Sequence, residues 1–174
     1  MISAGRDVRN QSPADLQAAP GGIAGSRGGL PILPSQRDTG RAMSHENVIE
    51  VVERAFEAWS RGDIDTYLSH LCSDVEAVPF GAALEGKVCR GHDEVRAWWR
   101  AQSEVWETFV LCAEEFMPVG AGLVVSGRWE AVGRSGVKLS APAAWVFGFS
   151  GEKIAYWQAY TSRAAALEAV ELSE

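Results

Sequence analysis

Apolar side chains recur every three to four residues between Ser44 and Gly62, and polar residues separate them. In an α-helix this spacing gathers the apolar side chains on one face. The residues on that face are Val48, Val51, Val52, Ala55, Phe56 and Trp59. Because Ser commonly caps the start of a helix and Gly commonly follows its end, the pattern predicts a first helix between these two positions.

The same spacing predicts two more helices before residue 108. Asp63 can cap a short helix, after which a polar turn leads into an extended stretch over 75–80. The apolar face of this helix is Ile64, Tyr67, Leu68 and Leu71. A loop punctuated by glycines over 81–91 then precedes a third helix, whose first-turn acids Asp93 and Glu94 suit the helix dipole. Its apolar side is Val95, Trp98, Trp99, Gln102 and Val105. We expect it to end near Glu107.

From residue 108 onward the hydrophobic period changes from that of helices to that of strands. Four strands are predicted, at 108–117, 123–132, 137–149 and 154–161, and short segments containing glycine join them as in hairpins. Bulky residues alternate with small ones from 143 to 150, so the bulky face of the third strand is expected to point inward. A last short helix is predicted over 162–170.

Helices followed by an antiparallel meander predict an α+β fold. We expect three N-terminal helices to pack on one face of a cone-shaped, curved sheet that is antiparallel or mixed, with the short C-terminal helix closing the chain. Such an arrangement leaves space for a cavity between the helices and the sheet.

The first 43 residues differ in composition from the remainder. They hold seven of the 18 Gly and four of the seven Pro, but none of the Phe, Trp or Tyr residues. A segment without large apolar rings cannot build a core, so we predict a disordered tail over 1–43 and one domain over 44–174. Because Met43 stands at the boundary, an alternative is that translation begins there and the native protein lacks the tail.

The charge of the domain argues against two classes of partner. The chain carries 16 Lys and Arg against 23 Asp and Glu, and the tail, with five Arg and three Asp, leaves the domain at −9. An acidic domain repels phosphate backbones, and no apolar run reaches the roughly 18 residues that a membrane span requires. We therefore expect neither nucleic acid nor a membrane as a partner.

The spacing of Cys and His predicts neither a disulfide framework nor a metal site. Cys72, Cys89 and Cys112 form no CxxC pair, and the three His residues are equally scattered. The chain also shows no secretory signal pattern. We therefore expect reduced thiols, a cytoplasmic location, and no metal or other cofactor.

Three segments resemble the SnoaL-like domains of the nuclear transport factor 2 (NTF2-like) superfamily, which includes polyketide cyclases, ketosteroid isomerases and limonene epoxide hydrolases. They are VVERAFEAWSRGDIDTYLSHLCSDVE, RGHDEVRAWW and FGFSGEKIAYWQAYTSRAAALEA, and together they span nearly the whole domain. The resemblance implies the cone-shaped fold and a homodimer through the outer sheet face, employing Tyr156, Gln158 and Tyr160. In an enzyme it implies cofactor-free acid/base chemistry, namely isomerisation, cyclisation or hydrolysis.

The catalytic residues that this resemblance implies for a ketosteroid isomerase are replaced. The Tyr and the first Asp of those enzymes fall at Ala55 and Pro79. The second Asp falls at Trp145, or at Ala144 in a register shifted by one residue. None of these side chains can act as the general base or as the acid of an oxyanion hole, so steroid isomerisation by that mechanism is not expected.

An epoxide hydrolase would need an acid and a base inside the cavity. Arg128 and Glu130 lie two residues apart, which places them on one face of a predicted strand. If Trp129 and Ala131 face the core, however, the charged pair lies on the outer face, in solvent or at a dimer interface. We favour this second arrangement.

The seven Trp residues predict an aromatic pocket for a small, flat, hydrophobic organic molecule. The pocket candidates are Trp59, Trp98, Trp99, Gln102, Trp129, Trp145 and Trp157. Weaker polar candidates are Tyr67, Glu85, His92, Arg128 and Glu130. Two alternatives stay open: the rings fill the cone completely, or the domain is a non-catalytic binding or dimerisation module. An ionisable group in the cavity would favour an enzyme, and an apolar cavity would favour binding.

Overall fold

A computed structural model describes residues 44–80 and 86–171 of the chain. The predicted tail over 1–43, the alternative start at Met43 and the pocket candidate Glu85 lie outside the described residues. None of the helices in the described ranges is long and apolar enough to cross a membrane.

The first two helices begin where their capping residues predict, and the first also ends where predicted. In α1 (His45–Ser60) the Ser44 hydroxyl accepts a hydrogen bond from the backbone N–H of Asn47 at 3.3 Å. In α2 (Ile64–Ser69) the Asp63 carboxylate accepts one from the N–H of Thr66 at 3.1 Å. Each bond satisfies a backbone donor that the first helical turn leaves unpaired. Between the helices, Gly62 has a φ of 72°, a left-handed conformation that glycine adopts without strain.

The remaining helices are α3 (Gly91–Val105) and α4 (Arg163–Glu171). Both match predicted helices to within two residues at each end. At the start of α3 the Glu94 carboxylate accepts a hydrogen bond from the backbone N–H of Arg90 at 2.7 Å. An acid in the first turn thus caps the helix as well as interacting with its dipole.

Six strands form one mixed sheet in the order β2-β1-β6-β5-β4-β3. β1 and β6 are parallel, and every other neighbouring pair is antiparallel. The strands are β1 (Leu71–Val78), β2 (Cys89–Arg90), β3 (Trp106–Val119), β4 (Gly122–Gly133), β5 (Lys138–Ser150) and β6 (Lys153–Tyr160).

Two details of this sheet correct the sequence prediction. β1 begins at Leu71, which was expected on the second helix, because α2 ends at Ser69 with His70 as its C-cap. The carbonyl oxygen of His70 accepts a hydrogen bond from the N–H of Ile154 at 2.9 Å, so the chain joins the sheet as soon as the helix ends. The predicted loop over 81–91 also contains β2, a strand of two residues that pairs with β1 at Glu76 and Ala77.

Close packing of β3 against β4 accompanies the curvature of the sheet. The pairing of these strands shifts register between Ala113 and Glu115, which marks a β-bulge. Opposite the bulge, a Cβ atom on Gly127 would lie 1.9 Å from the carbonyl oxygen of Cys112. Only glycine allows the two backbones to approach this closely.

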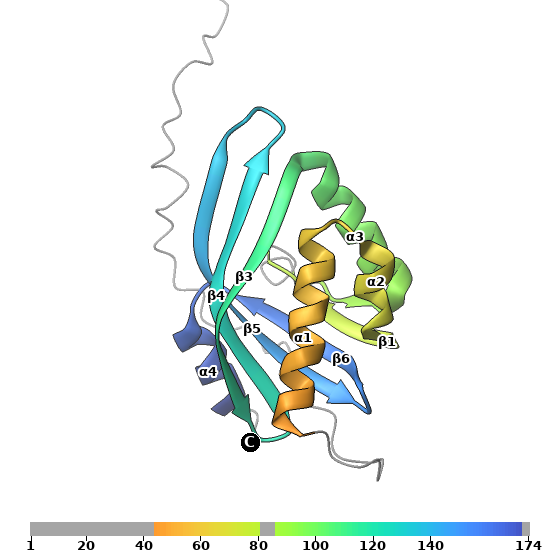
Figure 1. Ribbon diagram of the computed structural model, residues 1–174, viewed down its shortest axis with the longest axis vertical. Coiled ribbons are helices and arrows are strands. Elements are labelled where there is room, and N and C mark those ends of the chain that lie inside the picture. Colours follow the sequence, from red (N-terminus) through yellow and green to blue (C-terminus); the bar gives the residue numbers. More distant parts are fainter. Residues whose placement is uncertain (1–43, 81–85, 172–174) are drawn as a thin grey trace, which may run out of the picture.

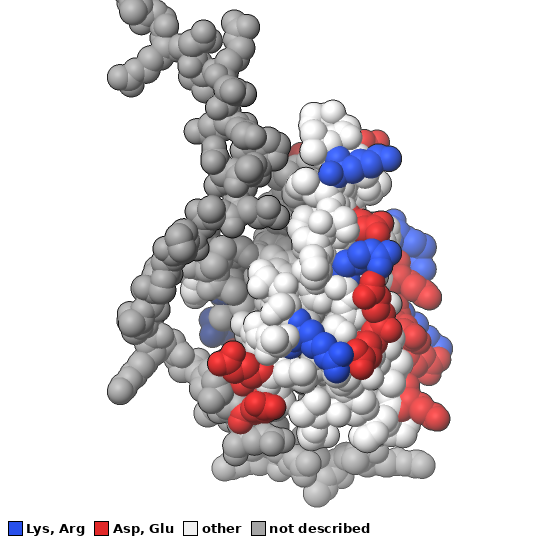
Figure 2. All heavy atoms as spheres, turned by 90° about the vertical axis from the view of Figure 1, so that its left-hand side faces the viewer, with Lys and Arg blue, Asp and Glu red and all other residues white. Residues whose placement is uncertain are grey.

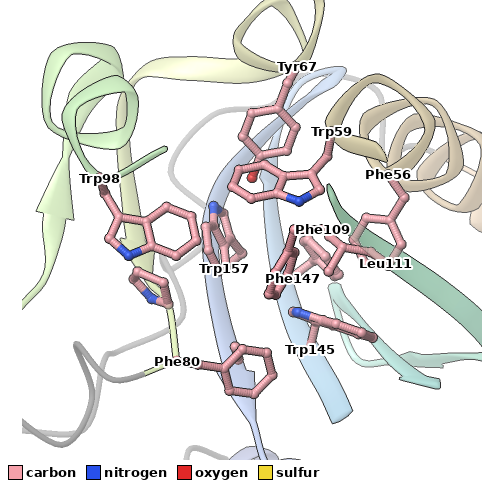
Figure 3. A pocket seen from close by; sticks show the side chains of 12 residues that line it. Phe56, Trp59, Tyr67, Phe80, Trp98, Phe109, Leu111, Trp145, Phe147 and Trp157 are labelled. Carbon is pink, nitrogen blue, oxygen red and sulfur yellow. The ribbon is translucent and has the colours of Figure 1, made fainter. Parts of the chain in front are cut away.

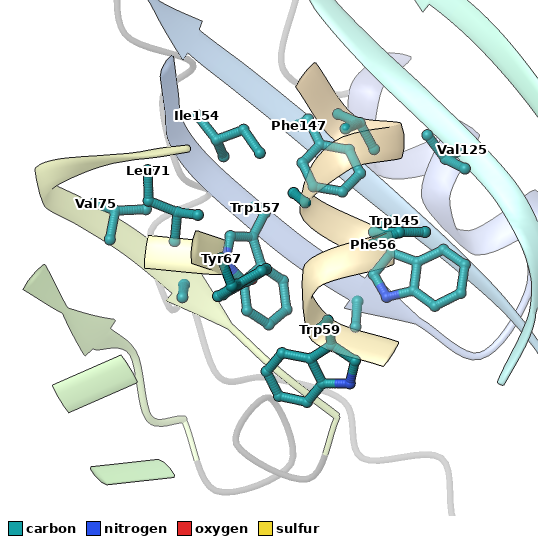
Figure 4. Close-up of a cluster of buried hydrophobic side chains, with 14 of the residues drawn as sticks. Phe56, Trp59, Tyr67, Leu71, Val75, Val125, Trp145, Phe147, Ile154 and Trp157 are labelled. Atoms are coloured by element: carbon teal, nitrogen blue, oxygen red, sulfur yellow. The ribbon is translucent and has the colours of Figure 1, made fainter. Parts of the chain in front are cut away.

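The helices cover both faces of the sheet. Figure 1 shows α1, α2 and α3 on one side of the curved sheet and α4 on the other. The cluster of buried side chains on the side of α1 to α3 contains most of the large residues (Figure 4), including Phe56, Trp59, Tyr67, Leu71, Val125, Trp145, Phe147, Ile154 and Trp157. This confirms that the bulky face of β5 points inward.

The opposite face of the sheet is also buried where α4 lies on it. This second cluster consists of Val78, Val124, Ala144, Val146, Tyr156, Ala166 and Val170. Ala144 and Val146 alternate with the bulky residues of β5, so their small size leaves room for the helix. The small residues on this face of β5 were recognised from the sequence, but the packing of α4 on them was not predicted.

Charged side chains of both signs are intermixed on the exposed surface. Figure 2, which views the molecule from the left of Figure 1, shows acidic and basic residues next to one another. On β3 and β4, Arg128 pairs with Glu130 at 2.8 Å and also with Glu114. All three side chains are about half exposed, so these pairs contribute little to stability.

Candidate functional site

A cavity of about 30 Å³ lies between the helices and the inner face of the sheet (Figure 3). Twelve residues line it, and they come from α1, α2, α3, β3, β5, β6 and the segment that follows β1. They are Phe56, Trp59, Tyr67, Pro79, Phe80, Trp98, Phe109, Leu111, Trp145, Phe147, Trp157 and Ala159.

Helical and strand periodicity bring these side chains to one place. Phe56 and Trp59 are three residues apart in α1 and therefore share a face of the helix. Each contributing strand of the meander supplies two residues at i and i+2, which point to the same face of the sheet. These pairs are Phe109 with Leu111, Trp145 with Phe147, and Trp157 with Ala159.

The lining rings contact one another and fill most of the cone. Trp59 stacks on Trp98 with centroids 5.3 Å apart and meets Tyr67 edge-on at 5.3 Å. Phe56 meets Trp145 edge-on at 5.0 Å. One water molecule needs a cavity volume of roughly 10–15 Å³. The cavity of about 30 Å³ therefore has room for only two or three water-sized molecules.

As far as the described residues form it, the lining contains no Asp, Glu, His, Lys, Arg or Cys residue. Tyr67 is its one titratable group, and burial raises the pKa of this hydroxyl above its usual value near 10. The hydroxyl therefore stays protonated at neutral pH and can donate a hydrogen bond. A second polar atom, the indole nitrogen of Trp157, is buried and has no hydrogen-bond partner within the described residues.

Four of the seven predicted pocket residues line the cavity: Trp59, Trp98, Trp145 and Trp157. Trp129 lies behind the cavity wall, where it stacks on Phe109 with centroids 5.5 Å apart and an interplanar angle of 11°. Trp99 packs against the buried cluster without lining the cavity.

Gln102 does not line the cavity either. Its side-chain oxygen accepts a hydrogen bond from the indole N–H of Trp106 at 3.2 Å. From the sequence, this amide was expected among the pocket residues. The partner is instead a side chain one turn further along the chain, at the point where α3 gives way to β3.

Of the weaker polar candidates, Tyr67 lines the cavity. His92 does not: its Nε2 lies 3.2 Å from the carbonyl oxygen of Leu71, a contact that joins the start of α3 to β1. Arg128 and Glu130 lie on the exposed surface as the ion pair described above, so they are not cavity residues. This agrees with the outer-face arrangement favoured from the sequence.

The positions that correspond to ketosteroid isomerase catalytic residues retain a place at the site without its chemistry. Pro79 and Trp145 both line the cavity, whereas Ala55 is buried in the adjoining core. An acid at either lining position would have faced the cavity. In this chain those two positions instead add apolar surface to the wall.

Sequence reasoning missed several lining residues because it concentrated on Trp and on polar groups. Phe109 and Leu111 carried a usable signal, since they lie two residues apart in a predicted strand and therefore share one face. Phe80 and Ala159 carried no such signal. Phe80 lies just beyond the end of β1. Ala159 is a small side chain in β6, and nothing in its residue type indicates that it borders a cavity.

Within the described ranges, no three Asp, Glu, His or Cys side chains lie close enough together to hold a metal ion. The chemical capacity of the cavity therefore rests on aromatic surface and neutral hydrogen-bond donors. Such a lining suits binding of an apolar molecule.

Comparison with known proteins identifies relatives in sequence and in structure. The profile of the family described as "SnoaL-like domain" matches residues 52–157. Among curated proteins, none matches this sequence.

Solved structures share the fold at low sequence identity. An NTF2-like protein of unknown function from Burkholderia pseudomallei is 24% identical with a TM-score of 0.61, covering 74% of this chain and 98% of that one. TerC, co-crystallised with polyporic acid, is 21% identical with a TM-score of 0.61, covering 72% and 98%. A protein with a ketosteroid isomerase-like fold from Catenulispora acidiphila, in complex with trimethylamine, is 16% identical with a TM-score of 0.58, covering 70% and 92%. These likenesses confirm the α+β fold that the sequence predicted.

Proposed function

The chain belongs to the family of SnoaL-like domains, and from this premise we propose that it binds a small, flat, hydrophobic organic molecule in its aromatic cavity. The composition of the lining carries the proposal. All twelve residues are apolar or aromatic, and four of them are Trp. Walls of this kind, with few polar groups, suit an apolar organic ligand.

The size of the cavity sets a condition on binding. Pockets for drug-sized ligands measure roughly 300–1,000 Å³, and this cavity is about 30 Å³. A ligand of one or two rings therefore binds only if a lining side chain turns aside. The half-buried lining residues are the ones free to do so, and they are Phe80, Trp98, Phe109 and Leu111.

Two structural relatives support a ligand-binding role. TerC was crystallised with polyporic acid, and the Catenulispora protein with trimethylamine. We propose that this chain likewise takes up a small organic molecule, and these two compounds are the first to test.

The lining favours binding over acid/base catalysis. An isomerase, cyclase or hydrolase that works without a cofactor needs a base or acid beside its substrate, which contributes about 10²- to 10⁴-fold in rate. Among the twelve described lining residues, the only polar groups are the neutral hydroxyl of Tyr67 and indole N–H groups. We therefore propose a binding protein rather than an acid/base enzyme.

Fluorescence titration of the Trp residues tests the proposal. We expect saturable quenching by flat aromatic or terpenoid compounds in a broad panel. An absence of saturable quenching by every compound would mean that the rings simply fill the core.

Trp98 and Trp99 provide a matched pair of variants for the same titration. Both are half-buried in α3, but only Trp98 lines the cavity. Trp98→Ala removes a ring that must turn aside before a ligand can enter the cavity. We therefore expect this variant to bind indane about tenfold more tightly than the wild type. Trp99→Ala should leave the affinity unchanged. Equal effects of the two variants would argue against binding in this cavity.

We also propose a homodimer through the part of the outer sheet face that α4 leaves exposed. Tyr156, one of the residues expected at that interface, is buried beneath α4 and donates a hydrogen bond to Gln158 at 2.5 Å. The interface must therefore lie beside α4, without Tyr156. Sedimentation equilibrium should give twice the mass of the chain, and a monomer at all concentrations would contradict the dimer.

A further inference from the structure

We propose that the Tyr67 hydroxyl and the Trp157 indole N–H form a two-donor site that binds the oxygen of a neutral ketone whose remainder is flat and apolar. This inference rests on the proposed function, because it specifies which ligand the same cavity takes. It begins from two donors in the lining, the Tyr67 hydroxyl and the one indole N–H of the lining that is buried without a partner among the described residues, that of Trp157.

Trp157 supplies a buried donor without an acceptor. Its side chain is 5% exposed, and its indole nitrogen has no hydrogen-bond partner among the described residues. The nearest ring is that of Trp98, which lies edge-on at 6.2 Å between centroids. Buried donors in proteins are rarely left unpaired, because the unfolded chain would hydrate them. An unpaired donor in a cavity wall is therefore available to an acceptor on a ligand.

Tyr67 supplies the second donor. Its side chain is 6% exposed and contacts Trp59. Figure 3 shows its hydroxyl directed into the group of aromatic rings, and in this view the indole nitrogen of Trp157 is on the side of its ring that faces Tyr67. Burial raises the pKa of the Tyr67 hydroxyl, so the group keeps its proton in neutral solution.

The charge of the site selects a neutral acceptor. No cationic side chain of the described residues lines the cavity, so a carboxylate or phosphate would be buried there without a counter-ion. A ketone oxygen has two lone pairs, carries no charge and can accept from both donors. The rest of the ligand must be apolar, because the other lining residues are hydrocarbon or aromatic surface.

A matched pair of ligands tests the site: indane and 1-indanone, which differ by one carbonyl group. In a purely apolar cavity indane should bind more tightly, because the carbonyl must lose its hydration. If the two donors meet the carbonyl, 1-indanone should bind at least about tenfold more tightly to the full chain in titration calorimetry.

Two variants remove one donor each and keep an aromatic ring. In Tyr67→Phe and in Trp157→Phe we expect the preference for 1-indanone to fall by about tenfold. Trp106→Phe is the control, because its N–H is already bonded to Gln102 and it does not line the cavity. The control should keep the full preference. Thermal unfolding of each variant establishes that it is folded.

A spectroscopic signature tests the site without any substitution. The indole proton of Trp157 should move downfield when 1-indanone is added and should not do so with indane. If the indole proton behaves the same with both ligands, the inference is wrong even where the variants fail to fold.

The outcomes separate this inference from the proposed function. If both ligands bind and indane binds equally or more tightly, the donors are not used and the inference fails, while the proposed function stands. A preference for 1-indanone that survives in both Phe variants also overturns the inference. If neither ligand binds to the wild type, the proposed function fails, and the two-donor site fails with it.

Discussion

Burial of Tyr67 links the cavity to the pH dependence of stability. In the unfolded chain a Tyr ionises near pH 10, and burial raises the pKa of Tyr67 in the folded protein. Its contribution to stability is complete below pH 10 and is lost as the pH rises toward the folded pKa. We expect the free energy of unfolding to fall above pH 10 by up to about 1.4 kcal/mol per pH unit from this group.

Urea unfolding at pH 9 and pH 11 measures this effect. Tyr67→Phe should lose less stability between the two pH values than the wild type does. Burial also raises the pKa values of Tyr156 and Tyr160, so part of the loss should remain in the variant. Identical losses in both proteins would show that Tyr67 ionises normally in the folded state.

Gly127 sets the close approach of β3 and β4. An added Cβ would lie 1.9 Å from the carbonyl oxygen of Cys112, so the backbone itself must shift in Gly127→Ala. We expect a loss of about 2 kcal/mol or more in the free energy of unfolding. Gly133→Ala, in the same strand, is the control, since a Cβ added there would lie 3.7 Å from the carbonyl oxygen of Val137, an ordinary contact distance. Urea unfolding should show a far smaller change for the control, and equal losses would refute the steric account.

At the scale of single residues, the sequence predicted which rings are buried better than it predicted which rings border empty space. Trp98 and Trp99 are adjacent at the edge of the apolar face of one helix, so helical periodicity cannot separate them. Only the packing of Trp98 against Trp59 and Trp157 places it at the cavity. The partner of Gln102 was likewise not predictable, because Trp106 had been assigned to the end of the helix rather than to the start of β3.

Among the elements, α4 has the most specific structural role, since it covers the outer face of the sheet. Ala166 is fully buried there, against residues of β4, β5 and β6. Ala166→Glu should place a charge in an apolar interface and lower the free energy of unfolding by at least about 2 kcal/mol. Ala164 is exposed on the same helix, so Ala164→Glu should be almost neutral.

Thermal unfolding with a dye that binds exposed apolar surface reads out this comparison. Destabilisation and dye binding are expected only for the substitution at Ala166. If both Glu variants unfold at the same temperature as the wild type, α4 does not dock on the sheet in solution.

Helices and strands with clear periodicity and caps were predicted nearly to their ends. The exceptions depend on distant pairing. β2 has only two residues and exists because it pairs with β1, so no local pattern could reveal it. The early start of β1 at Leu71 similarly depends on the bond between His70 and Ile154, which are far apart in the sequence.

For the whole molecule, the order of elements and the family resemblance predicted the fold, and the profile match and solved structures confirm it. The cavity could be predicted only in kind. Aromatic walls follow from Trp on inward faces, but the remaining volume depends on how those rings tilt against one another. The rings occupy most of the space between helices and sheet, and a cavity of about 30 Å³ remains.

The central claim is that the aromatic cavity is a ligand site, and two-dimensional ¹H–¹⁵N NMR of the indole groups tests it most directly. The chain has seven Trp residues, of which four line the cavity. On titration with 1-indanone, the signals of Trp59, Trp98, Trp145 and Trp157 should shift and saturate with one dissociation constant, while those of Trp99 and Trp106 stay in place. An absence of saturable shifts, or saturation confined to Trp99 and Trp106, would contradict the account.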